Sequence, residues 1–208
     1  MVKITDQGIE KYLMDLSFEY DPHILEMERI AKEKNFPIVD RLVGRLLFVL
    51  TRIRNPRLIV ELGSGFGYSA YWFALALGDG KVVMTDYEEG HIGYAKAVFE
   101  KAGLRGKVEF RVGEALEIIE EYEGIDILFI DLDKWQYVEA VRRAIPRLSS
   151  NALVIADNTL WYGKVLEERG DRDTEGIKEF NHYMYRHGDF FTTIIPLRDG
   201  ILLAYKMS

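Results

Sequence analysis

The sequence predicts an α/β protein in which a doubly wound, mostly parallel sheet of seven strands carries helices on both faces. Short apolar runs alternate with helical stretches from residue 57 onward, which is typical of repeated strand–helix units. The first run ends in three alternating glycines, Gly63, Gly65 and Gly67, as expected of a tight strand-to-helix turn. The chain closes with two strand-like segments, 190–195 and 201–205, which must pair antiparallel because their connection is so short.

Three helices are expected before the sheet. Residues 5–19 repeat apolar side chains at helical spacing. The pair Asp21-Pro22 then predicts a cap followed by proline at the first position of a second helix. A third helix over 39–54 has a continuous apolar stripe and is stopped by an Asn-Pro pair.

The whole chain, 1–208, is expected to form one domain, in which a helical extension, 1–55, precedes a cofactor-binding core, 56–208. A chain of 208 residues with 48% hydrophobic residues suits one core of this size. The expected parallel strands, with helices between them, lie near residues 57–62, 81–86, 107–112, 125–131 and 151–156. A helix over 173–187 leads into the closing hairpin, which forms the antiparallel edge of the sheet.

Composition excludes several classes of protein. No apolar run reaches the roughly 18 residues of a membrane span, and the N-terminus lacks the layout of a signal peptide, so we expect a soluble, cytoplasmic protein. The absence of cysteine rules out disulfides, thiolate metal sites and cysteine nucleophiles. Any metal must therefore be held by oxygen or nitrogen ligands. The same absence, with few glutamines and many charges, hints at a thermophilic source.

The glycine turn predicts a nucleotide-type cofactor site. Glycines let a ligand approach bare backbone, and a helix starting near Tyr68 would direct free N–H groups at that ligand. A dinucleotide fingerprint would place its third glycine at position 68, where the chain has tyrosine instead. A nicotinamide dehydrogenase is therefore disfavoured.

Acidic side chains follow most of the predicted strands, at the edge where an open parallel sheet binds its ligand. Asp86 lies about twenty residues after the glycine turn, where a carboxylate can accept hydrogen bonds from ribose hydroxyls, although it could also cap the next helix. Glu114 could accept from an adenine amino group or simply favour the helix dipole.

Asp131, Asp157 and Asn158 predict a metal site. They follow two neighbouring strands, and strand ends in such a sheet are about 5 Å apart, so these hard oxygen ligands can converge on one Mg²⁺, Mn²⁺ or Ca²⁺. Each residue taken alone could instead be a turn former. The histidines, by contrast, are expected to be solvated and away from the strand ends; they are His23, His91, His182 and His187.

A basic helix face leaves a nucleic-acid partner open. The net charge of −7 argues against broad capture of nucleic acid. A local patch on the third helix could still bind tRNA, or could be an ordinary solvated surface. The arginines concerned are Arg41, Arg45, Arg52, Arg54 and Arg57.

Three motifs together resemble the cation-dependent O-methyltransferases, the family of the catechol and caffeoyl-CoA O-methyltransferases. The resemblance runs from about residue 38 to the end, including the hairpin 196–201. It rests on Glu61-Leu62-Gly63-Ser64-Gly65-Phe66-Gly67-Tyr68-Ser69, on Asp131-Leu132-Asp133-Lys134 with Tyr137, and on Asp157-Asn158-Thr159-Leu160-Trp161. It implies a class I methyltransferase fold, which is Rossmann-like, S-adenosylmethionine as the methyl donor, and a homodimer.

The resemblance also implies roles for individual residues. Lys134 matches the lysine that takes the acceptor's proton, beside a divalent cation that lowers the pKa of a phenol. Asp131, Asp157 and Asn158 match the metal ligands. The residues implied to surround S-adenosylmethionine are Glu61, Gly63, Gly65, Gly67 and Ser69 at its methionine end, Asp86 at its ribose, Gly113, Glu114 and Ala115 at its adenine, and Asp131.

The chain departs from the family beside the acceptor. Leu132 lacks the polar residue of the caffeoyl-CoA type, Asp133 matches it, and neither matches the aromatic pair of the catechol type. The segment 36–40 also lacks the small polar residues expected beside the substrate. Four aromatic side chains could line an acceptor site or belong to the core: Phe66, Trp135, Trp161 and Tyr162.

These observations predict a metal-dependent O-methyltransferase that uses S-adenosylmethionine and acts on a small phenol or vicinal diol. One alternative keeps the fold and methylates a hydroxylated tRNA base. Another, of a different class, is a non-catalytic protein that binds S-adenosylmethionine.

Overall fold

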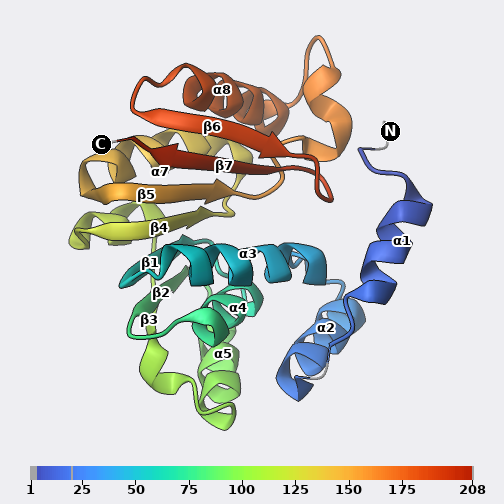
Figure 1. Ribbon diagram of the computed structural model, residues 1–208, viewed down its shortest axis with the longest axis vertical. Helices are drawn as coiled ribbons and strands as arrows, with labels where there is room; N and C mark the ends of the chain where they lie inside the picture. The colour runs from blue at the N-terminus through green and yellow to red at the C-terminus, as the bar shows by residue number, and fades with distance from the viewer. Residues whose placement is uncertain (1–3, 20, 208) are drawn as a thin grey trace.

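Seven strands form one sheet in the computed structural model, which describes residues 4–19 and 21–207. They are β1 (Leu58–Leu62), β2 (Lys81–Asp86), β3 (Val108–Val112), β4 (Ile125–Ile130), β5 (Leu148–Ala156), β6 (Phe190–Ile195) and β7 (Ile201–Lys206). The strand order is β3-β2-β1-β4-β5-β7-β6, as Figure 1 shows. The first five strands are parallel and β7 is antiparallel to both of its neighbours, so the predicted sheet is confirmed.

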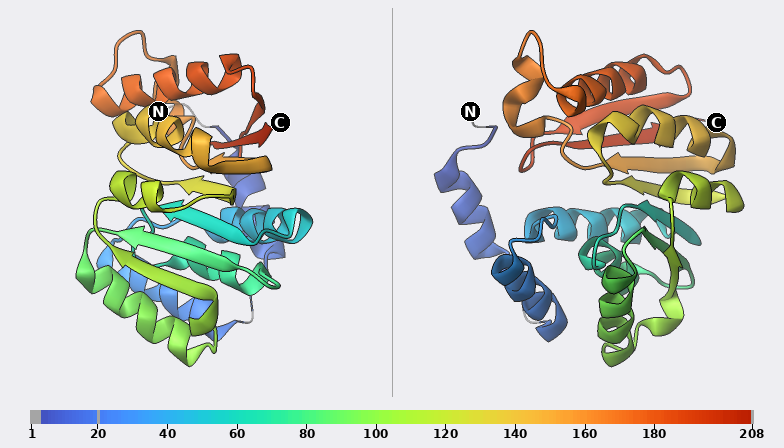
Figure 2. Two further views of the ribbon diagram at one scale, coloured as in Figure 1. Left: turned by 90° about the vertical axis from the view of Figure 1, so that its left-hand side faces the viewer. Right: turned by 180° about the vertical axis from the view of Figure 1, so that it is seen from behind.

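Helices cover both faces of this sheet, as the two views of Figure 2 show. Alternation along β1 explains the two layers, because Ile59 packs in the core with helices of one face and Val60 in the core with helices of the other. The first face takes α2, α3, α4 and α5, and the second takes α6, α7 and α8. The helices are α1 (Gln7–Leu16), α2 (Pro22–Lys34), α3 (Arg41–Arg54), α4 (Tyr68–Ala76), α5 (Glu89–Lys101), α6 (Ala115–Ile118), α7 (Tyr137–Ala144) and α8 (Arg172–Arg186).

The N-terminal helices form where the sequence predicts them. The Asp21 carboxylate accepts hydrogen bonds from the backbone N–H groups at the start of α2, and Pro22 occupies the first position. Asn55 ends α3 in the left-handed conformation, with φ of 48°. No residue of α1 is buried, and the Thr5 hydroxyl just before it donates to the carbonyl of Pro196 at 3.2 Å. This end of the chain therefore reaches the turn between β6 and β7, on the right of Figure 1.

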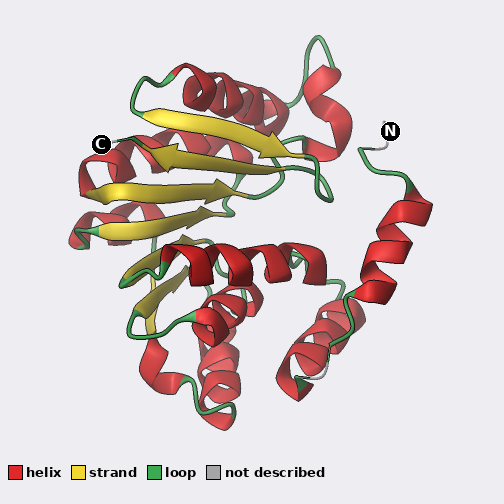
Figure 3. Ribbon diagram, in the orientation of Figure 1, coloured by secondary structure: helices red, strands yellow, loops and turns green. Residues whose placement is uncertain are grey.

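Strand β5 begins earlier than predicted, at Leu148 rather than at residue 151. The pairing between β4 and β5 shifts register after Ile125, and Asn151 adopts φ of 62°. The shift coincides with the polar residues Ser149, Ser150 and Asn151, so the apolar pattern of the strand begins only at Ala152. Figure 3 shows β5 lying between β4 and the antiparallel pair. None of the described helices has the length and apolar character that crossing a bilayer requires.

Candidate active site

The predicted site residues gather at the carboxyl ends of the parallel strands. The glycine turn joins β1 to α4, and Gly67, with φ of 90°, is the cap residue of α4. Gly63 has φ of 83°, and a side chain there would collide with the carbonyl oxygen of Asp131. The turn therefore lies directly against the end of β4, which requires glycine at position 63.

Glu61 is completely buried beneath this turn. Its Oε1 accepts the hydroxyl of Ser69, while its Oε2 has no hydrogen-bond partner in the described chain. Burial raises the pKa of Glu61 to about 7, although the hydroxyls of Ser64 and Ser69 oppose the shift. An unpaired buried carboxylate oxygen of this kind is suited to a cationic ligand group such as an ammonium.

Asp86 ends β2 close to the turn. Its Oδ1 accepts the backbone N–H of Glu88 at 2.8 Å and lies 3.1 Å from Nδ1 of His91. Its Oδ2 makes no hydrogen bond within the described residues, so it is available to a ribose hydroxyl. The prediction that the histidines lie away from the strand ends is wrong for His91, because the first turn of α5 folds back onto the end of β2.

The end of β3 completes the cofactor side. Gly113 donates its backbone N–H to the carbonyl of Asp86 at 3.0 Å, which fixes the two strand ends together. Glu114 is exposed and makes no capping hydrogen bond at the start of α6, whereas Ala115 is buried. Gly113, the first of the three residues predicted to flank an adenine, thus lies beside the predicted ribose ligand.

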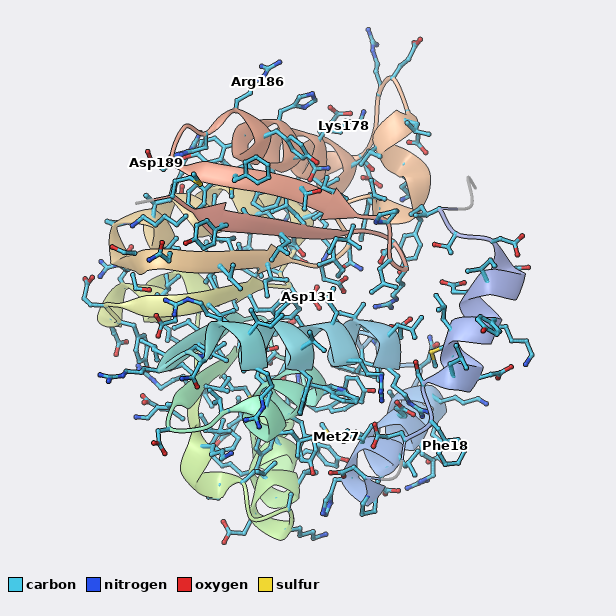
Figure 4. All side chains as sticks on the ribbon, in the orientation of Figure 1. Phe18, Met27, Asp131, Lys178, Arg186 and Asp189 are labelled. Atoms are coloured by element: carbon cyan, nitrogen blue, oxygen red, sulfur yellow. The ribbon has the colours of Figure 1, made fainter. Side chains whose placement is uncertain are left out.

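Asp131 and Asp157 occupy equivalent positions on neighbouring strands. Ile130 pairs with Ala156 in the register of β4 and β5, so the two aspartates are the next residues of each strand. Figure 4 shows Asp131 in the middle of the molecule, beyond the end of β4. Asp157 is 1% exposed and its Oδ1 has no hydrogen-bond partner among the described residues. Burial, followed by the nearby Asp131 carboxylate, raises the pKa of Asp157 well above its usual range.

Asn158 donates its amide nitrogen to the carboxylate of Asp199. Its Oδ1 makes no hydrogen bond within the described residues. Among the described residues no three His, Cys, Asp or Glu side chains are grouped so that they could hold a metal. The predicted set has two carboxylates and one amide oxygen, and an unpartnered carboxylate oxygen in a buried position fits a hard divalent cation.

Lys134 lies beside Asp131 and is 6% exposed. Its Nζ is 3.1 Å from Oδ1 of Asp131, 2.9 Å from the carbonyl of Leu132 and 2.9 Å from the hydroxyl of Tyr137. The Tyr137 hydroxyl in turn donates to the Asp157 carbonyl at 3.1 Å. The amine therefore has a fixed position, at the strand ends where the predicted metal ligands lie.

The predicted aromatic lining divides into two groups. Nζ of Lys134 lies 5.5 Å from the ring centre of Trp161, and Tyr162 is 43% exposed next to it. Phe66 is buried in the core, and Trp135 is covered by the guanidinium of Arg172. Of these four residues, Trp161 is therefore the one whose ring faces Lys134, and Tyr162 packs against Trp161.

Much of the predicted basic face on α3 is occupied within the chain. Arg41 donates to Glu28 at 3.0 Å, Arg54 donates to Asp126 at 2.6 Å, and Arg52 donates to a backbone carbonyl of α4 at 3.1 Å. These arginines are bound to internal acceptors. The tRNA alternative stays a prediction without support from this face.

Sequence reasoning did not assign a role to Arg198 or Asp199, which lie in the turn between β6 and β7. Nη1 of Arg198 is 3.6 Å from Oδ2 of Asp157, and Asp199 accepts the Asn158 amide. The Asp-Gly pair of this turn was visible in the sequence as a hairpin signal. Only the order of the strands, with β7 next to β5, brings that hairpin to the site.

Comparison with known proteins finds a family match that spans the site residues described above. Residues 14–207 match the family model described as O-methyltransferase. The catechol O-methyltransferase of Niastella koreensis is 30% identical over 212 residues, which cover 95% of this chain and 96% of that protein.

Solved structures share the whole fold. A methyltransferase from Geobacter sulfurreducens is 41% identical and superposes with a TM-score of 0.88 over 100% of both chains. An O-methyltransferase from Bacillus cereus, solved in complex with SAH, is 27% identical, with a TM-score of 0.87 over 96% of this chain and 97% of that one. The predicted class I fold is thereby confirmed.

Proposed function

The chain belongs to the O-methyltransferase family, and from that premise we propose that it methylates a hydroxyl group of a small phenol or vicinal diol, with S-adenosylmethionine as donor and a divalent cation at the acceptor. The observation that carries this proposal is the position of the Lys134 amine, 3.1 Å from Asp131, at the strand ends where Asp157 has an unpaired carboxylate oxygen. This arrangement would place a base beside a hard-cation ligand set, next to the turn proposed to hold the cofactor.

Three features support S-adenosylmethionine as the donor. The unpaired oxygen of Glu61 suits the ammonium of its methionine part, and the free oxygen of Asp86 suits its ribose. The positive φ angles of Gly63, Gly65 and Gly67 form the tight turn between β1 and α4 that a nucleotide-type cofactor requires. The Bacillus cereus relative was solved with SAH, which is the form of this donor after its methyl group has left.

Asp131, Asp157 and the Asn158 amide oxygen would hold the cation. A divalent cation bound there would lower the pKa of an acceptor hydroxyl, so that more of this hydroxyl is ionised at neutral pH. Two carboxylates and an amide suit Mg²⁺, Mn²⁺ or Ca²⁺ and are poor ligands for zinc.

Lys134 would take the proton of the acceptor hydroxyl. Its hydrogen bonds to Leu132 and Tyr137 hold the amine in place, so the side chain is already ordered before the acceptor binds. The acceptor oxygen then forms its bond to the methyl carbon as the bond from sulfur to that carbon breaks. The chain's contribution to this step is alignment, for which Trp161 offers a ring face beside Lys134.

A methyl-transfer screen tests the proposal. Purified protein is incubated with S-adenosylmethionine and with catechols, phenolic thioesters or bulk tRNA, each with and without Mg²⁺, and SAH formation is measured. We expect activity on a small catechol or phenol only when Mg²⁺ is present. Turnover of tRNA alone, or cofactor binding without turnover of any acceptor, would contradict the proposed acceptor class.

A further inference from the structure

Arg198 places a positive charge beside the predicted metal ligands. It lies in the turn between β6 and β7 with φ of 55°, a left-handed conformation that is uncommon for arginine. Its side chain is 24% exposed, and Nη1 approaches Oδ2 of Asp157 to 3.6 Å. The turn therefore brings the guanidinium next to one of the predicted metal ligands.

The guanidinium acts there through its charge rather than through hydrogen bonds. At 3.6 Å the contact with Asp157 is too long for a hydrogen bond, and Arg198 makes no other within the described residues. Arg54, by contrast, donates to Asp126 at 2.6 Å. A partly buried guanidinium with unused donors is costly unless neighbouring charges compensate it.

Three carboxylates supply that compensation. Burial lowers the pKa of Arg198, but Asp157, Asp199 and Asp40 more than offset this and leave it raised. Asp40 caps α3 by accepting the backbone N–H of Val43, and Asp199 is bound to Asn158. Asp157 is the carboxylate of this group that a cation would also use.

We propose that Arg198 is a built-in counter-charge. Its guanidinium offsets the negative charge of Asp157 and thereby lowers the affinity of the Asp131, Asp157 and Asn158 set for divalent cations. A guanidinium and a divalent cation near one carboxylate repel each other, and at a few ångströms in a poorly solvated site that repulsion is substantial. The same charge stabilises the fold before a cation binds. This inference rests on the proposed metal site.

Two variants separate charge from shape. Arg198→Asn removes the charge and keeps a residue that tolerates positive φ, whereas Arg198→Lys keeps the charge. Arg147→Gln is the matched control, because Arg147 has a similar exposure of 22% but pairs with Glu123 beside the opposite end of β5. Circular dichroism establishes that each variant is folded.

The measurement is Mn²⁺ affinity, by electron paramagnetic resonance of free Mn²⁺, without donor or acceptor. We expect Arg198→Asn to bind Mn²⁺ about tenfold more tightly or better, and Arg198→Lys and Arg147→Gln to stay close to the parent protein. In EDTA, Arg198→Asn should unfold at a lower temperature than the parent, and saturating Mn²⁺ should shrink that difference.

Equal Mn²⁺ affinity in the parent protein and Arg198→Asn would overturn the counter-charge while leaving the metal site intact. So would unchanged Mn²⁺ affinity together with a raised KM for the acceptor, which would make Arg198 an acceptor-binding residue. Absence of Mn²⁺ binding to both proteins would overturn the metal site itself. Mn²⁺ binding to Arg198→Asn but not to the parent protein would support the counter-charge.

Discussion

The side-chain amide nitrogen of Asn158 lies 3.0 Å and 2.9 Å from the two carboxylate oxygens of Asp199. An amide that donates to one side must present its carbonyl oxygen to the other, so Asp199 selects the orientation of Asn158. Outer residues that orient metal ligands commonly affect affinity nearly as much as the ligands do. The hairpin between β6 and β7 thus takes part in the predicted metal site without contributing a ligand.

Replacing Asp199 tests this role. Asp199→Ala should raise the Mg²⁺ concentration needed for half-maximal methyl transfer by about 10- to 100-fold, because the Asn158 amide loses its orienting partner. The KM for S-adenosylmethionine should change little, since the residues predicted to contact the cofactor follow β1 to β4. A Mg²⁺ titration of initial rates gives the answer, with Asn158→Ala as the reference for complete loss of the ligand. Equal Mg²⁺ dependence in Asp199→Ala and the parent would contradict the orienting role.

Lys134→Met should lower turnover by roughly 10² or more while leaving S-adenosylmethionine affinity close to that of the parent. Methionine is an unbranched side chain only one atom shorter than lysine, but it cannot accept a proton. Single-turnover rates and calorimetric cofactor titration measure the two effects separately. Lys134→Arg keeps the positive charge beside Asp131 and should be nearly as slow, which distinguishes proton transfer from charge. Unchanged turnover in both variants would mean that Lys134 only begins its helical turn and is not the base.

Glu61 gives the unliganded protein a pH-dependent stability. Burial raises its pKa to about 7 from an ordinary value of 4.5, so the folded state holds this proton more tightly than the unfolded state. The resulting stability is present below the ordinary value and is lost as the pH rises through about 7. Relative to Glu61→Gln, the parent should lose about 2 to 3 kcal/mol of unfolding free energy between pH 5 and pH 8. Urea unfolding of both proteins at the two pH values measures this; a constant difference would mean that Glu61 ionises normally.

Asp86 should contribute directly to donor affinity. Asp86→Ala is expected to weaken S-adenosylmethionine binding by about 1 to 3 kcal/mol, because the ribose loses a charged acceptor. His91→Ala leaves the carboxylate in place and should have a smaller effect, since His91 lies on the Oδ1 side of Asp86. Isothermal calorimetry with each variant checks the order. A larger loss in His91→Ala than in Asp86→Ala would assign the cofactor contact to the imidazole.

The positions of the aspartates at the strand ends were predictable from the sequence, whereas their contacts with His91 and Arg198 were not. Parallel strands repeat one geometry, so Asp86, Asp131 and Asp157 could be placed at one edge from periodicity alone. His91 was misplaced because the sequence does not show how sharply α5 turns back on β2. Arg198 reaches Asp157 only because β7 inserts between β5 and β6, and the order of strands in a sheet is a tertiary property.

The cation decides between this mechanism and the many methyl transfers that need only a donor and a base. We expect excess EDTA to abolish methyl transfer, and Mg²⁺ or Mn²⁺ to restore it, because an acceptor hydroxyl is a poor nucleophile until its pKa falls. Asp157→Ala should be inactive with or without added cation. Donor binding should survive both treatments, since Glu61 and Asp86 lie outside the ligand set.

The competing view makes Asp157 and Asn158 turn residues after β5. It predicts that chelation leaves the rate unchanged and that Asp157→Ala mainly alters stability. The burial of Asp157 makes the stability effect informative, because removing this carboxylate relieves a desolvation penalty but also takes away one of the charges that compensate Arg198. An Asp157→Ala protein that is at least as stable as the parent in EDTA, yet inactive in Mg²⁺, would show that this carboxylate is retained for the cation. Full activity in excess EDTA would remove the cation from the mechanism.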